Sequence, residues 1–138
     1  MKNTFELAHV GINNSDAKSA QKLCDLLCLM FNLAPKQGKK SEFAGTFFEC
    51  VRSQYLGTHG HIGMATADLA SAVEELTDKG FGFNRETAAH FDDGQLQNIY
   101  LDGEFGGFAI PVMQKYQYLT PSMTPRPAGP PRDQGVPS

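Results

Sequence analysis

Two segments of the chain alternate between polar and apolar residues, and a helical pattern follows each of them. Residues 6–13 (ELAHVGIN) and 59–66 (HGHIGMAT) show the two-residue period of a strand. Apolar residues then recur with helical spacing over about 14–33 and again from about 67, until Gly80 ends the second pattern. The chain is therefore predicted to form a strand and then a helix, twice.

The apolar stripes of the two predicted helices indicate which residues enter the core. Asn14 or Ser15 is predicted to cap the first helix, and Ala67 or Asp68 to begin the second. Each stripe would bury one helix face against a sheet. The stripes consist of Ala20, Leu23, Cys24, Leu27 and Phe31 in the first helix, and Leu69, Ala72, Val73 and Leu76 in the second.

Short strand patterns follow each helix and complete the same plan in both halves. Turns at Gly38 and at residues 92–94 separate these patterns. The prediction is an α+β domain of two β-α-β-β-β modules, at about residues 5–53 and 57–115. The later strands are predicted at residues 42–44 and 46–52 in the first module, and at 83–88, 96–101 and 108–114 in the second.

The two halves also repeat part of their sequence. Residues 9–20 (HVGINNSDAKSA) align with residues 61–72 (HIGMATADLASA) at a constant offset of 52. The shared residues include the leading histidine, the glycine two positions later and an aspartate near the helix start. Such a repeat predicts two copies of one supersecondary unit.

Alternation along the strands assigns the repeated histidines to one face. Successive strand side chains point to opposite faces, so His9 and His61 lie away from the predicted helix-packed core. Two curled sheets placed side by side would direct both histidines into a shared cleft. The residues predicted to lie under the helices are Val10, Ile12, Ile62 and Met64.

The closing strands of the halves supply two more positions on the cleft face. Aligning the halves through Gly45 and Gly107 places Glu49 opposite Pro111. Two imidazoles and one carboxylate form a good ligand set for a first-row divalent ion, whereas proline has no side-chain donor. The sequence thus offers three metal ligands and a fourth equivalent position, Pro111, without a ligand atom.

These motifs resemble the vicinal-oxygen-chelate superfamily, which includes glyoxalase I, extradiol dioxygenases and bleomycin-resistance proteins. The resemblance rests on HVGI…D…A, HIGM…D…A and the carboxylate that ends the first half, and it covers about residues 5–115. More narrowly, LAHVGINN, YLGTHGHIGMATADLASAVEELTDKGFGFN and IYLDGEFGGFAIPVMQK are similar to a glyoxalase-like domain. That domain accompanies some bacterial keto-deoxy-phosphogluconate and keto-hydroxyglutarate aldolases.

The resemblance implies a metal-dependent enzyme and a homodimer. Its metal positions map onto His9, Glu49 and His61, which would hold Zn, Ni, Mn or Fe, and Glu49 is the candidate catalytic residue. The fourth position maps onto Pro111 and departs from the pattern. The implied activity is of lyase, isomerase or dioxygenase type, on a small vicinal-oxygen substrate such as an α-oxo or hydroxy acid.

The alternative is a non-catalytic module that binds a small molecule. It would be an accessory to a sugar-acid aldolase or a drug-sequestering protein, with a degenerate metal site at Pro111. In either case the cleft is expected to be aromatic and apolar with a few polar groups, as small-ligand sites generally are. By strand parity, its expected lining includes Phe47, Asn98, Tyr100 and Met113.

Composition and charge exclude some classes of partner and indicate a location for the protein. The formal charge is −3, and the chain contains no block of Lys and Arg that would fit nucleic acid. It contains no apolar run of about 20 residues, and its MKNTFE start is not a signal peptide. Three cysteines in no metal-binding pattern favour a reduced, cytoplasmic setting. Residues 116–138 hold six of the eight prolines and are predicted to form an extended tail.

Overall fold

The computed structural model describes residues 2–115 and has an α+β fold. Within these residues one mixed sheet of nine strands carries two helices, which confirms the predicted class. Neither of the helices described has the length and apolar character needed to cross a membrane. The predicted proline-rich tail, residues 116–138, lies outside the described residues.

The elements follow the predicted order with two additions. A short strand precedes the turn at Gly38, and the predicted strand 108–114 is divided at Ile110, next to a proline that cannot donate a backbone hydrogen bond. The first half contains β1 (Phe5–Asn13), α1 (Ala17–Phe31), β2 (Pro35–Gln37), β3 (Ser41–Ala44) and β4 (Phe48–Val51). The second contains β5 (Gly60–Thr66), α2 (Leu69–Asp78), β6 (Phe83–His90), β7 (Leu96–Leu101), β8 (Phe108–Ala109) and β9 (Pro111–Gln114).

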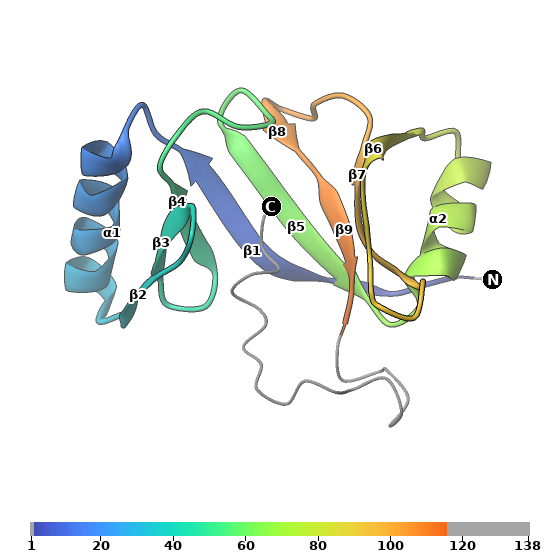
Figure 1. The fold of residues 1–138 in the computed structure, drawn as a ribbon, viewed down its shortest axis with the longest axis horizontal. Coiled ribbons are helices and arrows are strands. Elements are labelled where there is room, and N and C mark those ends of the chain that lie inside the picture. The colour runs from blue at the N-terminus through green and yellow to red at the C-terminus, as the bar shows by residue number, and fades with distance from the viewer. Residues whose placement is uncertain (1, 116–138) are drawn as a thin grey trace.

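Strands β1 and β5 pair in the middle of the sheet and join the two halves. The strand order is β2-β3-β4-β1-β5-β9-β7-β6, with β8 also beside β5. β1 is antiparallel to β5 and parallel to β4, while β5 is parallel to β8 and β9. Figure 1 shows α1 and α2 at opposite ends of the molecule, with β1 and β5 between them. The halves therefore share one continuous sheet instead of two sheets placed side by side.

The repeated aspartates cap both helices. The Asp16 carboxylate accepts a hydrogen bond from the Ser19 N–H at 2.8 Å, and Asp68 accepts one from the Ser71 N–H at 3.1 Å. Each side chain satisfies a backbone donor that the helix leaves unpaired. The prediction that Asn14 or Ser15 caps the first helix is wrong, because the cap lies at Asp16, whereas α2 begins directly after Asp68 as predicted.

Each helix packs on strands of its own half. Phe31 is 59% exposed, so its predicted place in the first stripe is wrong, and Cys28 packs against that core instead. The second stripe is confirmed in full. The core clusters are built around Ala20, Cys24, Ala44 and Cys50 for α1, and around Leu69, Val73, Ile99 and Val112 for α2.

Four apolar side chains in the middle of the central strands belong to neither core cluster. Helix α1 contacts the outer strands β2, β3 and β4, and α2 contacts β7, β9 and the central strand β5. The outer face of the β1–β5 pair is therefore half-buried where the sequence predicted helix cover. The residues concerned are Val10, Ile12, Ile62 and Met64.

Candidate metal centre

Strands β1 and β5 bring the two repeated histidines to adjacent places on the sheet. His9 stands opposite Gly63, and His61 stands opposite Gly11. The antiparallel pairing thus crosses the two copies of the H-x-G motif, so that each histidine faces the glycine of the other copy. A register shift between Leu7 and His9 marks a bulge at this point of β1.

The two glycines leave the space that the imidazole rings occupy. A Cβ atom on Gly11 would lie 2.0 Å from Cε1 of His61, and one on Gly63 would lie 2.8 Å from Cε1 of His9. Both separations are too short for any real side chain, although Gly11 and Gly63 have ordinary backbone angles. The repeat therefore keeps glycine at these positions because a ring lies against each one.

Strand β4 supplies the carboxylate. Glu49 stands level with Gly11 in the parallel β1–β4 pair and is 3% exposed. Its Oε2 accepts a 2.7 Å hydrogen bond from the hydroxyl of Ser41 on the neighbouring strand β3. This bond orients the carboxylate and leaves Oε1 directed at the histidines.

Three potential ligand atoms converge at the centre of the sheet. His61 Nε2 lies 3.1 Å from Glu49 Oε1 and 3.1 Å from His9 Nε2, and His9 Nε2 lies 3.6 Å from Glu49 Oε1. An ion held tetrahedrally at about 2.0–2.1 Å separates its ligands by about 3.3 Å. The residues predicted as metal ligands thus form a group that fits a divalent ion.

Burial and mutual contact set the protonation of this group. Burial, assisted by the neighbouring His61, lowers the pKa of His9 to about 4, although Glu49 acts in the opposite direction. Burial alone would raise the pKa of Glu49, but the hydrogen bond and charge of His61 and the hydrogen bond from Ser41 lower it overall. At neutral pH the site therefore presents a neutral His9 and an ionised carboxylate, the forms that bind metals.

Pro111 occupies the position in the second half that Glu49 occupies in the first. The pairs His61–Ala109 and Met64–Val112 share one register, in which Pro111 stands level with Gly63. Pro111 is fully buried and offers no ligand atom. The alignment of the halves that the sequence suggested is thus reproduced by the strand register.

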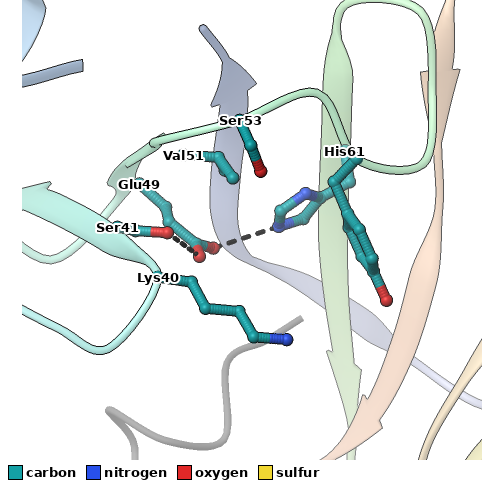
Figure 2. A pocket seen from close by; sticks show the side chains of 7 residues that line it. Lys40, Ser41, Glu49, Val51, Ser53 and His61 are labelled. Atoms are coloured by element: carbon teal, nitrogen blue, oxygen red, sulfur yellow. Dashed lines mark hydrogen bonds and ion pairs between the residues drawn. The ribbon is translucent and has the colours of Figure 1, made fainter. Parts of the chain in front are cut away.

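A pocket of about 300 Å³ opens beside the group. Glu49 and His61 form part of its wall, and Figure 2 shows the ammonium group of Lys40 extending alongside their contact. Its volume lies at the lower end of the range for small-molecule sites. The lining residues are Lys40, Ser41, Glu49, Val51, Ser53, Tyr55 and His61.

The residues predicted to line the cleft lie elsewhere along the sheet. Phe47 is about half exposed before β4, while Asn98 on β7 stands opposite Met113 on β9. Tyr100 is buried, and the centroid of its ring lies 6.4 Å from that of the His61 ring. None of these four residues is part of the 300 Å³ pocket, and their contact with a ligand stays a prediction.

Sequence reasoning missed Ser41 and did not assign Lys40 to the site. Ser41 faces Glu49 because β3 and β4 pair with Phe43 opposite Glu49 and Ser41 opposite Val51, which puts all of these side chains on one face. Extending the predicted strand by one residue, from Glu42 to Ser41, would have revealed the contact. Lys40 belongs to a basic stretch that could attract a carboxylate or phosphate, but no local pattern places it beside Glu49.

One buried atom of the group has no partner. His61 is 0% exposed, and no hydrogen-bond partner for its Nδ1 is present within residues 2–115. Metal-binding histidines usually donate their second ring nitrogen to an oxygen atom. This feature separates the group from a typical metal centre.

Comparisons with known proteins establish the fold alone. No family model and no curated protein matches the chain. Among solved structures, the chain is similar to the crystal structure of hypothetical protein BH1468 from Bacillus halodurans C-125. The TM-score is 0.57 at 12% sequence identity, over 81% of this chain and 95% of the other.

Proposed function

We propose that the protein is a glyoxalase-like, metal-dependent enzyme with two β-α-β-β-β modules. Its substrate is a small molecule with two neighbouring oxygens, such as an α-oxo or hydroxy acid. The observation that carries the proposal is the convergence of His9 Nε2, His61 Nε2 and Glu49 Oε1 within 3.1–3.6 Å of one another. Zn, Ni, Mn or Fe fits such a set.

The bound ion would polarise both substrate oxygens and stabilise negative charge that develops on them. The protein residues hold and orient the reacting groups. Gly11 and Gly63 fix the planes of the imidazole rings, and Ser41 fixes the carboxylate of Glu49. Three protein ligands would leave at least one coordination position of the ion for the substrate, and the pocket lies beside Glu49 and His61.

Glu49 is the residue to which we assign proton transfer. It is the carboxylate among the residues that line the pocket, and its Oε2 is bound by the hydroxyl of Ser41 while Oε1 faces the histidines. A base must reach its proton at hydrogen-bond distance. With Oε1 on the ion, Glu49 would take the substrate proton at Oε2, in exchange for the hydrogen bond from Ser41.

A small-molecule binding module without catalysis is the second candidate. The unpartnered Nδ1 of His61 favours it, because a metal-binding histidine usually has a second hydrogen bond. Pro111 favours it too, since the second half lacks a carboxylate where the first has Glu49.

Metal content of untagged protein, purified without chelator, separates the two candidates. We expect near-stoichiometric metal in the wild type and its loss in His61→Ala, because Ala removes one of three ligands. His59→Ala is the matched control, since His59 lies exposed against Gly107 and outside the group. Wild-type protein that takes up no Zn, Ni, Mn or Fe on titration would refute the enzyme proposal and support the binding module.

A further inference from the structure

The pocket beside the histidines has two chemically different walls. Glu49 and His61, from the proposed metal group, form one wall, and Lys40 and Ser53 contribute an ammonium and a hydroxyl to the other. Figure 2 shows the Lys40 side chain running below Glu49, with its charged end below the contact between Glu49 and His61. A ligand that reaches the proposed ion from this pocket also passes Lys40.

Arg52 fixes the turn that carries Lys40. Its guanidinium donates hydrogen bonds to the carbonyls of Gly38, Lys39 and Ser41 at 2.7–3.1 Å. The Arg52 backbone N–H donates to the Lys40 carbonyl at 3.0 Å. Arg52 is itself held by the buried Glu42, at 2.8 Å. A turn bound at four carbonyls has a fixed backbone, so that only the Lys40 side chain would have to be ordered when a ligand arrives.

The charge of Lys40 is not neutralised by the protein. Within residues 2–115 its ammonium forms no ion pair, and it lies 5.8 Å from the ring centroid of Tyr55. The carboxylate in the pocket, Glu49, is already engaged by Ser41 and His61. A divalent ion would add two positive charges to this one carboxylate and one ammonium, which leaves the pocket with an excess of positive charge.

We propose that this pocket selects substrates with an anionic group, and that Lys40 is the specificity-determining residue that binds this group. The proposal rests on the proposed function, because the same ligand bridges the ion and the ammonium. It narrows the substrate class to carboxylates such as α-oxo and hydroxy acids, and excludes uncharged carbonyl compounds of equal size. A charge-assisted hydrogen bond from the ammonium to the anionic group would give such discrimination.

Pyruvate and methyl pyruvate test the proposal, because they share the vicinal oxygens and differ in charge. Calorimetric titrations at low salt measure Mn²⁺ affinity first, and then the affinity of the Mn²⁺-loaded protein for each compound. The variants are Lys40→Met and the matched control Lys39→Met, whose side chain is on the same turn but outside the pocket. Both lysines are exposed, so neither substitution threatens folding.

We expect Lys40→Met to weaken pyruvate binding about tenfold, to leave methyl pyruvate binding unchanged and to leave Mn²⁺ affinity unchanged. Lys39→Met should match the wild type throughout. Equal losses for both compounds, no loss for pyruvate, or no pyruvate binding to the Mn²⁺-loaded wild type would overturn the Lys40 proposal alone. If the wild type does not bind Mn²⁺, the same titrations are made with Zn²⁺, Ni²⁺ and Fe²⁺, and failure to bind any of the four would overturn the proposed function and the Lys40 proposal with it.

Discussion

The two halves of the molecule build the same frame and equip it differently. Both have a strand with H-x-G, a helix capped by aspartate, and a closing strand beside the first. At the equivalent closing position the first half carries Glu49, oriented by Ser41, and the second carries the buried Pro111. The repeat thus provides two equivalent histidine positions, whereas the first half alone adds an acidic ligand and most of the pocket wall.

The largest expected effect comes from supplying a fourth metal ligand at position 111. Pro111→Glu should raise Mn²⁺ affinity about 100-fold, because a fourth, anionic ligand enters a site whose other three ligands are already placed. Without metal the same variant should be less stable than the wild type, since its carboxylate is buried. Calorimetry and thermal melts with and without Mn²⁺ measure both effects.

Pro111→Ala controls for loss of the proline ring. It should change stability without raising Mn²⁺ affinity. If Pro111→Glu also left the affinity unchanged, the equivalence of Glu49 and Pro111 around a metal would be wrong.

Substitution of the two glycines that face the imidazole rings should give the next largest effect and distinguish the halves. Gly11→Ala should lower Mn²⁺ affinity by about 10–100-fold and destabilise the protein by about 1–3 kcal/mol, because its methyl group meets the fully buried ring of His61. Gly63→Ala should cost less, since His9 is 12% exposed and has room to move. Urea denaturation and metal titration of both variants would measure the difference, and equal costs would contradict the asymmetry.

The helix caps should give equal and smaller effects. Asp16→Ala and Asp68→Ala each remove one hydrogen bond to a helix N-terminus, at 2.8 and 3.1 Å, and each should cost about 1 kcal/mol. Urea denaturation is the measurement, with Asp25→Ala, outside both caps, as a control. A large difference between the two variants would show that the halves are not equivalent in stability.

The smallest expected effect concerns an acidic side chain of the second half. The hydrogen bond from Lys79, with those from Asn3, lowers the pKa of Glu75 from 4.5 to about 2. A group with a depressed pKa stabilises the fold above its unfolded value and loses this contribution as pH falls. Wild type should therefore melt slightly above Glu75→Gln at pH 6, and the difference should shrink between pH 4.5 and 2. A difference that persisted at pH 2 would contradict this account.

Features that depend on local pattern were predictable from the sequence. The histidines lie on one face because strand alternation and the repeat both require it, and Glu49 followed from aligning the halves at their glycines. The class of fold followed from the alternation of strand and helical periods. These inferences use spacing within a few residues, or a comparison of the chain with itself.

Features that depend on pairing between strands were not predictable. The crossing of His9 onto Gly63, and of His61 onto Gly11, requires the register of β1 and β5, which no local pattern states. The place of Lys40 depends on a turn held by a side chain twelve residues further on, Arg52. Phe31 was misplaced because the helical stripe indicates which face is apolar, but not how far the sheet extends beneath it.

Because each imidazole ring lies against a glycine of the facing strand, the two histidines disfavour other registers between β1 and β5. If β1 slipped by two residues against β5, His9 would face Ala65 or His61 instead of Gly63, and every such partner carries a Cβ atom. Among these alignments, the one that accommodates both rings is the one that assembles the three ligands. The two histidines therefore favour the correct register between the two halves, and a shift of that register would also separate the three ligands.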